Sequence, residues 1–119
     1  MAEILIVDDE DDIRHLFALE LEDEGHQVRT ARDGSETMTL LREKRPDLVI
    51  LDIKLDQESG LELLKRISRE YDNLPVILCS AFSSYQSDFS SWLADGYVVK
   101  SSNLDELKQT VQRILEPRV

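Results

Sequence analysis

Short strand-like runs alternate along the chain with segments in which apolar residues recur at helical spacing. The strand-like runs are Ile4–Val7, Gln27–Ala31, Leu48–Leu51, Val76–Cys79 and Tyr97–Val99. The helical patterns that follow them cover residues 13–21, 35–44, 61–67, 83–94 and 104–115. Strands that alternate with helices favour right-handed crossovers and a parallel sheet covered by helices on both faces. The pattern therefore predicts an α/β domain built from five strand–helix units.

Individual positions add detail to this pattern. Leu48–Leu51 is apolar throughout, which is typical of a central strand covered on both faces. Gly25 is expected to end the first helix in a left-handed conformation. The Ser-rich segment 83–94 predicts only a weak amphipathic helix, because serine favours caps and turns over helix interiors. Within it we expect Phe89 to join the core and Trp92 to face a partner.

The composition restricts the classes of protein to which the chain can belong. Its 119 residues fit one domain, and its formal charge of -11 would repel a phosphate backbone, so we expect no direct binding of nucleic acid. The single cysteine, Cys79, lies in an apolar run and is expected to be a buried thiol, which suits a reducing cytoplasm. No apolar stretch is long enough to span a bilayer and no export signal precedes the first strand, so we expect a cytoplasmic protein with no membrane association.

Polar side chains stand directly at the ends of four predicted strands. They are Asp8 and Asp9, Asp52, Ser80, and Lys100. Since the carboxyl ends of parallel strands meet along one edge of a sheet, we expect these residues to share one pocket. Adjacent carboxylates repel one another unless a cation lies between them, and oxygen ligands of this kind suit Mg²⁺. Carboxylates, a divalent ion, a hydroxyl and an ammonium group together suit phosphoryl transfer, in which a carboxylate can be the nucleophile.

Some polar residues have a simpler interpretation. Glu10, Asp11 and Asp12 follow the acid pair at the predicted start of a helix, where carboxylates accept hydrogen bonds from free N–H groups and oppose the positive end of the dipole. Taken singly, the hydroxyl and ammonium residues would be ordinary solvated strand ends. We expect His15 and His26 to lie on the surface, because neither has a companion at metal-ligand spacing.

Several short motifs resemble those of one known family. They are Ile-Val-Asp-Asp-Glu at Ile6–Glu10, Asp52 with Gly60 eight positions later, Ser80-Ala81, and Tyr97–Lys100. Over essentially its whole length the chain is similar to the receiver domain of two-component response regulators. The resemblance implies a flavodoxin-like, doubly wound, five-stranded parallel sheet of order 2-1-3-4-5 with helices on both faces. It further implies a single receiver domain over residues 1–119, which is either a free-standing module or part of a longer regulator.

The resemblance also implies a phosphorylation site. Asp52 would take a phosphoryl group from the phosphohistidine of a sensor histidine kinase or a phosphotransfer protein. Mg²⁺ would be bound by Asp9, Asp52 and the backbone carbonyl of Lys54, with Asp8 acting mainly through water. Such a domain catalyses its own phosphorylation and dephosphorylation without being a conventional turnover enzyme.

A conformational switch is the second implication of the resemblance. The Ser80 hydroxyl and the Lys100 ammonium group would contact the phosphoryl oxygens, and Tyr97 would turn inward as Ser80 moves. This would alter the surface around the fourth helix, fifth strand and fifth helix and so control a downstream protein partner or an effector domain missing from this chain. Tyr97 is equally well interpreted as an aromatic residue packed on an edge strand.

Two positions depart from the family's usual pattern. Ser101 follows Lys100 where the family has a proline joined by a cis bond, and we predict a trans bond because cis bonds without proline are costly. Asp56 stands where a proline is common in the loop after the phosphate acceptor. Both departures favour an alternative function, namely a receiver-like module that binds its partner without phosphorylation.

Two other classes fit the sequence less well. A dinucleotide-binding domain would have a glycine-rich turn after the first strand, where this chain has acidic residues. A haloacid-dehalogenase-type phosphatase would have a second aspartate at the position of Lys54 and a longer chain.

Overall fold

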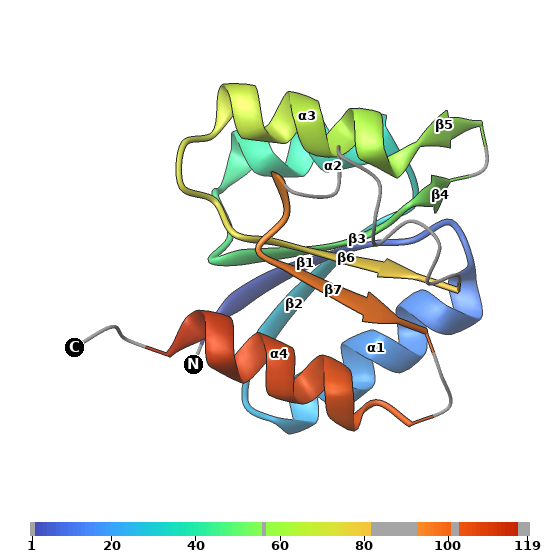
Figure 1. Ribbon diagram of the computed structural model, residues 1–119, viewed down its shortest axis with the longest axis vertical. Coiled ribbons are helices and arrows are strands. Elements are labelled where there is room, and N and C mark those ends of the chain that lie inside the picture. The colour runs from blue at the N-terminus through green and yellow to red at the C-terminus, as the bar shows by residue number, and fades with distance from the viewer. Residues whose placement is uncertain (1, 56, 82–92, 101–102, 117–119) are drawn as a thin grey trace.

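A five-stranded parallel sheet forms the middle layer of the molecule (Figure 1). The computed structural model describes residues 2–55, 57–81, 93–100 and 103–116. The strands of this sheet are β1 (Glu3–Val7), β2 (Gln27–Ala31), β3 (Leu48–Asp52), β6 (Val76–Ser80) and β7 (Gly96–Val99). They pair in the order β2-β1-β3-β6-β7, and every pair is parallel. The predicted order 2-1-3-4-5 is therefore confirmed.

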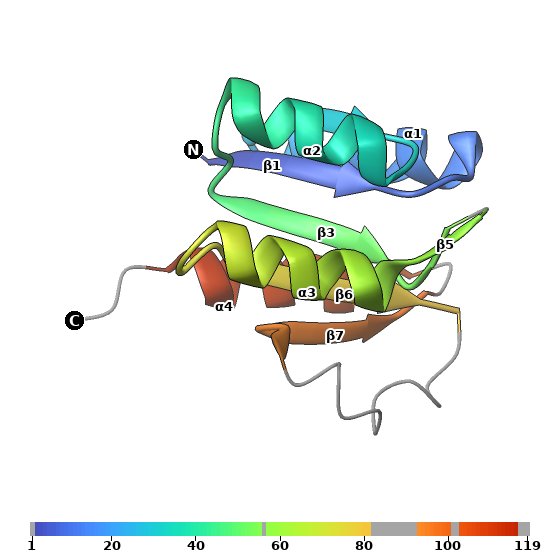
Figure 2. The same ribbon diagram turned by 90° about the horizontal axis from the view of Figure 1, so that it is seen from above.

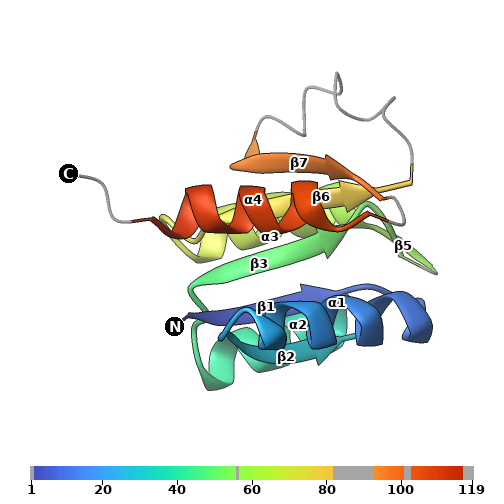
Figure 3. The ribbon, with the colours of Figure 1, turned by 90° about the horizontal axis from the view of Figure 1, so that it is seen from below.

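Helices cover both faces of the sheet (Figures 1 and 3). They are α1 (Asp11–Asp23), α2 (Gly34–Glu43), α3 (Gly60–Glu70) and α4 (Asp105–Leu115). Alternate residues of β1 enter two separate cores, since successive side chains of a strand point to opposite faces. Leu5 and Val7 pack with residues of α2 and α3, whereas Ile4 and Ile6 pack with residues of α1 and α4. The doubly wound architecture follows from this alternation.

The central strands are buried along their whole length. All residues of β3 and β6 are buried, as the uniformly apolar pattern of Leu48–Leu51 predicts. Both strands run one residue further than the apolar pattern, because the parallel pairing continues through Asp52 opposite Cys79 and Ser80 opposite Val99. The polar residues at these ends are thus held by the sheet itself.

The end of α1 has the predicted left-handed glycine. Gly25 has φ +96°, and its N–H donates to the carbonyl of Glu22 at 2.9 Å. The next N–H, that of His26, turns back to the carbonyl of Leu21 at 3.2 Å. His26 is only partly exposed, because this turn folds the residue against a hollow between α1 and α4. His15 is exposed as predicted.

Two features of the chain were not predicted from its pattern. A small antiparallel hairpin, β4 (Lys54–Leu55) and β5 (Glu58–Ser59), stands between β3 and α3 (Figure 2). Leu16 is one of the apolar residues in the helical pattern predicted over residues 13–21, but it is 41% exposed. The predicted helix over residues 83–94, with Phe89 and Trp92, falls almost entirely outside the described residues.

Among the helices that the structure describes, none is long and apolar enough to cross a membrane.

The carboxyl end of α2 is tied to β2 by one side chain. The Arg29 guanidinium donates to the carbonyls of Leu40 at 3.0 Å and Lys44 at 2.6 Å, which are among the acceptors that a helix end leaves unpaired. Arg29→Met is therefore expected to lower the free energy of unfolding by about 2 kcal/mol, measured by urea denaturation. Arg42→Met is the matched control, because Arg42 is exposed and makes only a 3.5 Å contact to Thr39. Equal midpoints for the two variants would contradict this role.

Candidate functional site

The polar residues at the carboxyl edge of the sheet come together. Asp8 follows β1, Asp52 and Ser80 end β3 and β6, and Lys100 follows β7. The Lys100 Nζ lies 2.8 Å from Asp8 Oδ2 and 3.2 Å from Asp52 Oδ2. Asp8, Asp52 and Ser80 are only 2%, 6% and 2% exposed. An ammonium group thus bridges two buried carboxylates that are 44 positions apart in the sequence.

Strand pairing fixes this arrangement. Val7 pairs with Leu51, so the residues that follow them, Asp8 and Asp52, emerge side by side. The hydrogen-bond ladder also runs one step beyond the strands: the Asp8 N–H donates to the Ala31 carbonyl at 3.1 Å, and the Lys100 N–H donates to the Ser80 carbonyl at 2.6 Å. The backbone at each site residue is therefore held by its neighbouring strand.

Burial and charge shift the pKa of Asp52 and of Lys100. Burial, and then the negative charge of Asp8, raise the pKa of Asp52 to about 6, although the nearby ammonium group of Lys100 acts in the opposite direction. Burial lowers the pKa of Lys100, but its hydrogen bond to Asp8 and the charges of Asp52 and Asp8 outweigh that effect and raise it overall. Near neutral pH the pocket therefore contains an ionised but poorly solvated carboxylate beside a fixed cation.

Three carboxylates in the described part of the chain form a possible cation site. One oxygen from each of Asp8, Asp9 and Glu10 lies within 4.8 Å of the others. Oxygen-only groups of this kind fit a hard divalent ion such as Mg²⁺. Asp52 is not a member of this group; its Oδ2 contacts Lys100 and its Oδ1 accepts the Lys54 N–H at 3.3 Å.

Glu10 was interpreted from the sequence as a carboxylate at a helix start that accepts hydrogen bonds from free N–H groups and opposes the dipole, and the hydrogen-bonding part of that interpretation is wrong. It is the N-cap residue of α1, but its side chain makes no capping hydrogen bond. Its carboxylate instead joins Asp8 and Asp9 and lies 3.8 Å from the Lys100 Nζ. The signal available in the sequence was the side-chain length, because the residues that cap well are the shorter Ser, Thr, Asp and Asn.

The β3–α3 connection packs against the end of β3. Gly60, the first residue of α3, donates its N–H to the Ile53 carbonyl at 2.6 Å. A Cβ atom on Gly60 would lie 2.0 Å from the backbone oxygen of Asp52. The hairpin between them begins at Lys54, whose side chain is exposed. The close approach of Gly60 therefore constrains the backbone of Asp52 and Ile53 at the end of β3.

The remaining predicted residues lie in different surroundings. Tyr97 is half-buried on the edge strand β7, where it packs against the core beneath α2 and α3. Cys79 is buried as predicted, and burial raises the pKa of its thiol to about 12. Asp56 and Ser101 lie outside the described residues, as does the predicted trans bond between Lys100 and Ser101.

A doubly wound sheet with an acidic pocket and a lysine at its carboxyl edge defines a receiver domain. The family model of the response regulator receiver domain matches residues 4–112, and the chain belongs to that family. It is a protein domain of two-component signal transduction.

Solved structures and curated proteins show the same relationship. The response regulator TrrA of Thermotoga maritima, solved with Mg²⁺ and BeF, is 47% identical with a TM-score of 0.93, covering 97% of this chain and 100% of TrrA. TrrA solved with the histidine kinase ThkA is 46% identical with a TM-score of 0.91, covering 98% of this chain and 100% of TrrA. The nitrogen assimilation regulatory protein NtrX of Azorhizobium caulinodans is 40% identical over 118 residues, which is 96% of this chain and 26% of NtrX. PhoP of Salmonella typhimurium, a virulence transcriptional regulatory protein, is 34% identical over 117 residues, which is 97% of this chain and 52% of PhoP.

The chain thus spans between 26% and 52% of the length of these curated relatives.

Proposed function

We propose that this receiver domain is a phosphorylation-controlled switch in which Asp52 accepts a phosphoryl group from the phosphohistidine of a histidine kinase or phosphotransfer protein. The observation that carries the proposal is the Lys100 ammonium group between the buried carboxylates of Asp8 and Asp52. Catalysis of phosphoryl transfer consists mainly of positioning and neutralisation of charge. A fixed cation 3.2 Å from the accepting carboxylate supplies both.

The transfer step is a displacement at phosphorus. A carboxylate oxygen of Asp52 attacks, a P–O bond forms, the P–N bond of phosphohistidine breaks, and the bonding electrons return to the histidine nitrogen. In this proposal the Lys100 ammonium group then neutralises negative charge on the phosphoryl oxygens, and the Ser80 hydroxyl donates a hydrogen bond to one of them. The raised pKa of Asp52 makes its carboxylate a stronger base, which favours attack provided that the group is ionised.

Mg²⁺ is the proposed cofactor, and when bound it supplies further neutralisation of the phosphoryl charge. We assign its binding to Asp9, Asp52 and the Lys54 carbonyl, with Asp8 acting mainly through water. Each carboxylate oxygen of Asp8 and of Asp52 has a protein partner in this structure, so direct binding of Mg²⁺ by Asp52 requires one of its oxygens to exchange that partner for the cation. TrrA has been solved in complex with Mg²⁺ and BeF, which supports Mg²⁺ as the cofactor of this chain.

The partners follow from the relatives. TrrA has been solved in complex with the histidine kinase ThkA, which supports a histidine kinase as the phosphodonor for this chain. Several curated relatives are transcriptional regulators of about twice this length, so a downstream partner or an attached effector domain is the proposed recipient of the signal. Ser80 and Tyr97 are the proposed switch residues, and the cytoplasm is the proposed location.

Intact-protein mass after exposure to acetyl phosphate and Mg²⁺ tests the function. The wild-type chain is expected to gain the mass of one phosphoryl group, because Asp52 is ionised near neutral pH and lies beside Lys100. Asp52→Asn is expected to gain none, and chelation of Mg²⁺ should abolish the gain in the wild type. An unmodified wild type would overturn the proposal. It would favour the interaction module that binds its partner without phosphorylation, an alternative supported by Asp56 and Ser101 at positions where the family usually has proline.

A further inference from the structure

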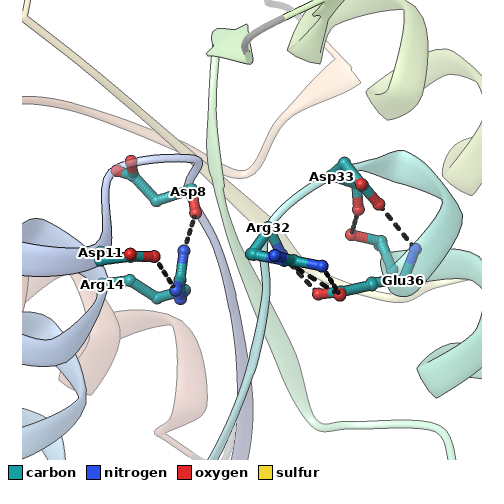
Figure 4. Close-up of polar contacts among 7 residues, drawn as sticks. Asp8, Asp11, Arg14, Arg32, Asp33 and Glu36 are labelled. Carbon is teal, nitrogen blue, oxygen red and sulfur yellow. Dashed lines mark hydrogen bonds and ion pairs between the residues drawn. The ribbon is translucent and has the colours of Figure 1, made fainter.

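The side chain of Arg14 contacts both a backbone carbonyl and a carboxylate side chain of the acidic segment that follows β1. Its side chain is only 15% exposed although it lies on the first turns of α1. The Arg14 Nη1 donates to the backbone carbonyl of Asp8 at 2.8 Å, and Nη2 donates to the Asp11 carboxylate (Figure 4). A guanidinium group has the planar arrangement of donors that can serve two acceptors at once.

Asp8 makes several polar contacts. Among the described residues, only Arg14 contacts its backbone carbonyl. Its N–H donates to Ala31, and its two carboxylate oxygens are occupied by the Glu10 N–H and by Lys100. The carbonyl belongs to the peptide unit that joins Asp8 to Asp9. Because that unit is planar, fixing the carbonyl direction also fixes the direction in which the backbone enters Asp9.

We propose that Arg14 is a positioning residue for the divalent-cation site, acting by locking the Asp8–Asp9 peptide so that the Asp9 carboxylate stays directed toward the pocket. This inference rests on the proposed function. Arg14 itself touches neither the cation nor the phosphoryl group. It acts through the backbone, and it is also a positive charge beside a site for a cation.

These two properties of Arg14 have opposite effects on Mg²⁺ affinity. A nearby positive charge repels Mg²⁺, so removing only a charge should tighten binding. Loss of a group that orients a metal ligand should weaken binding, and such partners typically contribute about tenfold or more to metal affinity. The direction of the change therefore separates positioning from simple electrostatics.

Calorimetric titration of Arg14→Gln with Mg²⁺ is the test. We expect about tenfold weaker binding than in the wild type despite the lost charge. Arg14→Lys keeps the charge and loses the planar fork, so it should also weaken binding. Arg32→Gln is the matched control, because Arg32 pairs with Glu36 after β2, makes no contact with Asp8, and carries the same charge (Figure 4). It should bind Mg²⁺ as tightly as the wild type or more tightly.

Amide hydrogen exchange in the metal-free protein gives a second measurement. The Glu10 N–H, which donates to Asp8 Oδ1, should exchange faster in Arg14→Gln than in Arg32→Gln. Equal or tighter Mg²⁺ binding by both Arg14 variants, or unchanged exchange at Glu10, would overturn the inference. A wild type that binds no Mg²⁺ would instead refute the proposed cofactor, and the exchange measurement would still decide whether Arg14 holds the loop.

Discussion

Gly60→Ala is expected to destabilise the protein by about 3 kcal/mol and to impair phosphorylation of Asp52 beyond that loss. The added Cβ would lie 2.0 Å from the Asp52 oxygen, 2.8 Å from the Ile53 Cα and 2.9 Å from the Asp52 carbonyl carbon. All three are backbone atoms, so no flexible side chain can move aside. Either α3 must withdraw from the sheet or the end of β3 must shift, and a shift of β3 displaces the accepting carboxylate.

Urea denaturation and the rate of phosphorylation by acetyl phosphate measure the two effects. Gly25→Ala is the matched control, since Gly25 has a positive φ of +96° but no atom within 4 Å of an added Cβ. It should cost about 1 kcal/mol from backbone strain alone and leave the phosphorylation rate of the folded protein unchanged. If Gly60→Ala behaves like Gly25→Ala, the contact between α3 and β3 does not position the site.

The sequence predicted the sheet and most of the site because both depend on strong, repeated signals. Fully apolar runs such as Leu48–Leu51 must be buried, and parallel connections then leave little freedom in topology. The polar residues that end such runs are brought to one edge by the same geometry. This is why Asp52 and Lys100 could be placed together before their contact was known.

The features that escaped prediction have weak or non-local signals. The strands Lys54–Leu55 and Glu58–Ser59 are each two residues long, which is too short to show the alternation of apolar and polar residues that predicts a strand. The exposure of Leu16 depends on the width of the buried face of α1, which the spacing alone does not define. The role of Arg14 depends on the backbone carbonyl of Asp8 as its hydrogen-bond acceptor. Because every residue has a backbone carbonyl, the sequence does not indicate which one a side chain will contact.

Titration of Asp52 is expected to make the metal-free protein less stable as pH rises from about 4 to about 6. The pKa of Asp52 is about 6 in the folded state against 3.8 for an unperturbed group, so in this range the folded protein binds more protons than the unfolded chain. Stability must then fall as pH rises, with a total loss on the order of 3 kcal/mol, and it levels off above pH 6. The stabilising contribution is complete below the unfolded pKa, where Asp52 is protonated in both states.

Asp52→Asn isolates this effect, because the amide has no charge to lose. In the presence of a chelator, the free energy of unfolding of Asp52→Asn minus that of the wild type should increase from pH 4 to pH 6 and then remain constant. Lys100→Met provides a second arm. The positive charge of Lys100 lowers the pKa of Asp52, so its removal should extend the pH-dependent loss of stability above pH 6. A constant difference between Asp52→Asn and the wild type across this range would mean that Asp52 is no harder to ionise in the fold than in the unfolded chain. Lys100 would then fully offset the effects of burial and of the Asp8 charge on Asp52, and no uncompensated negative charge at Asp52 would remain to attract Mg²⁺.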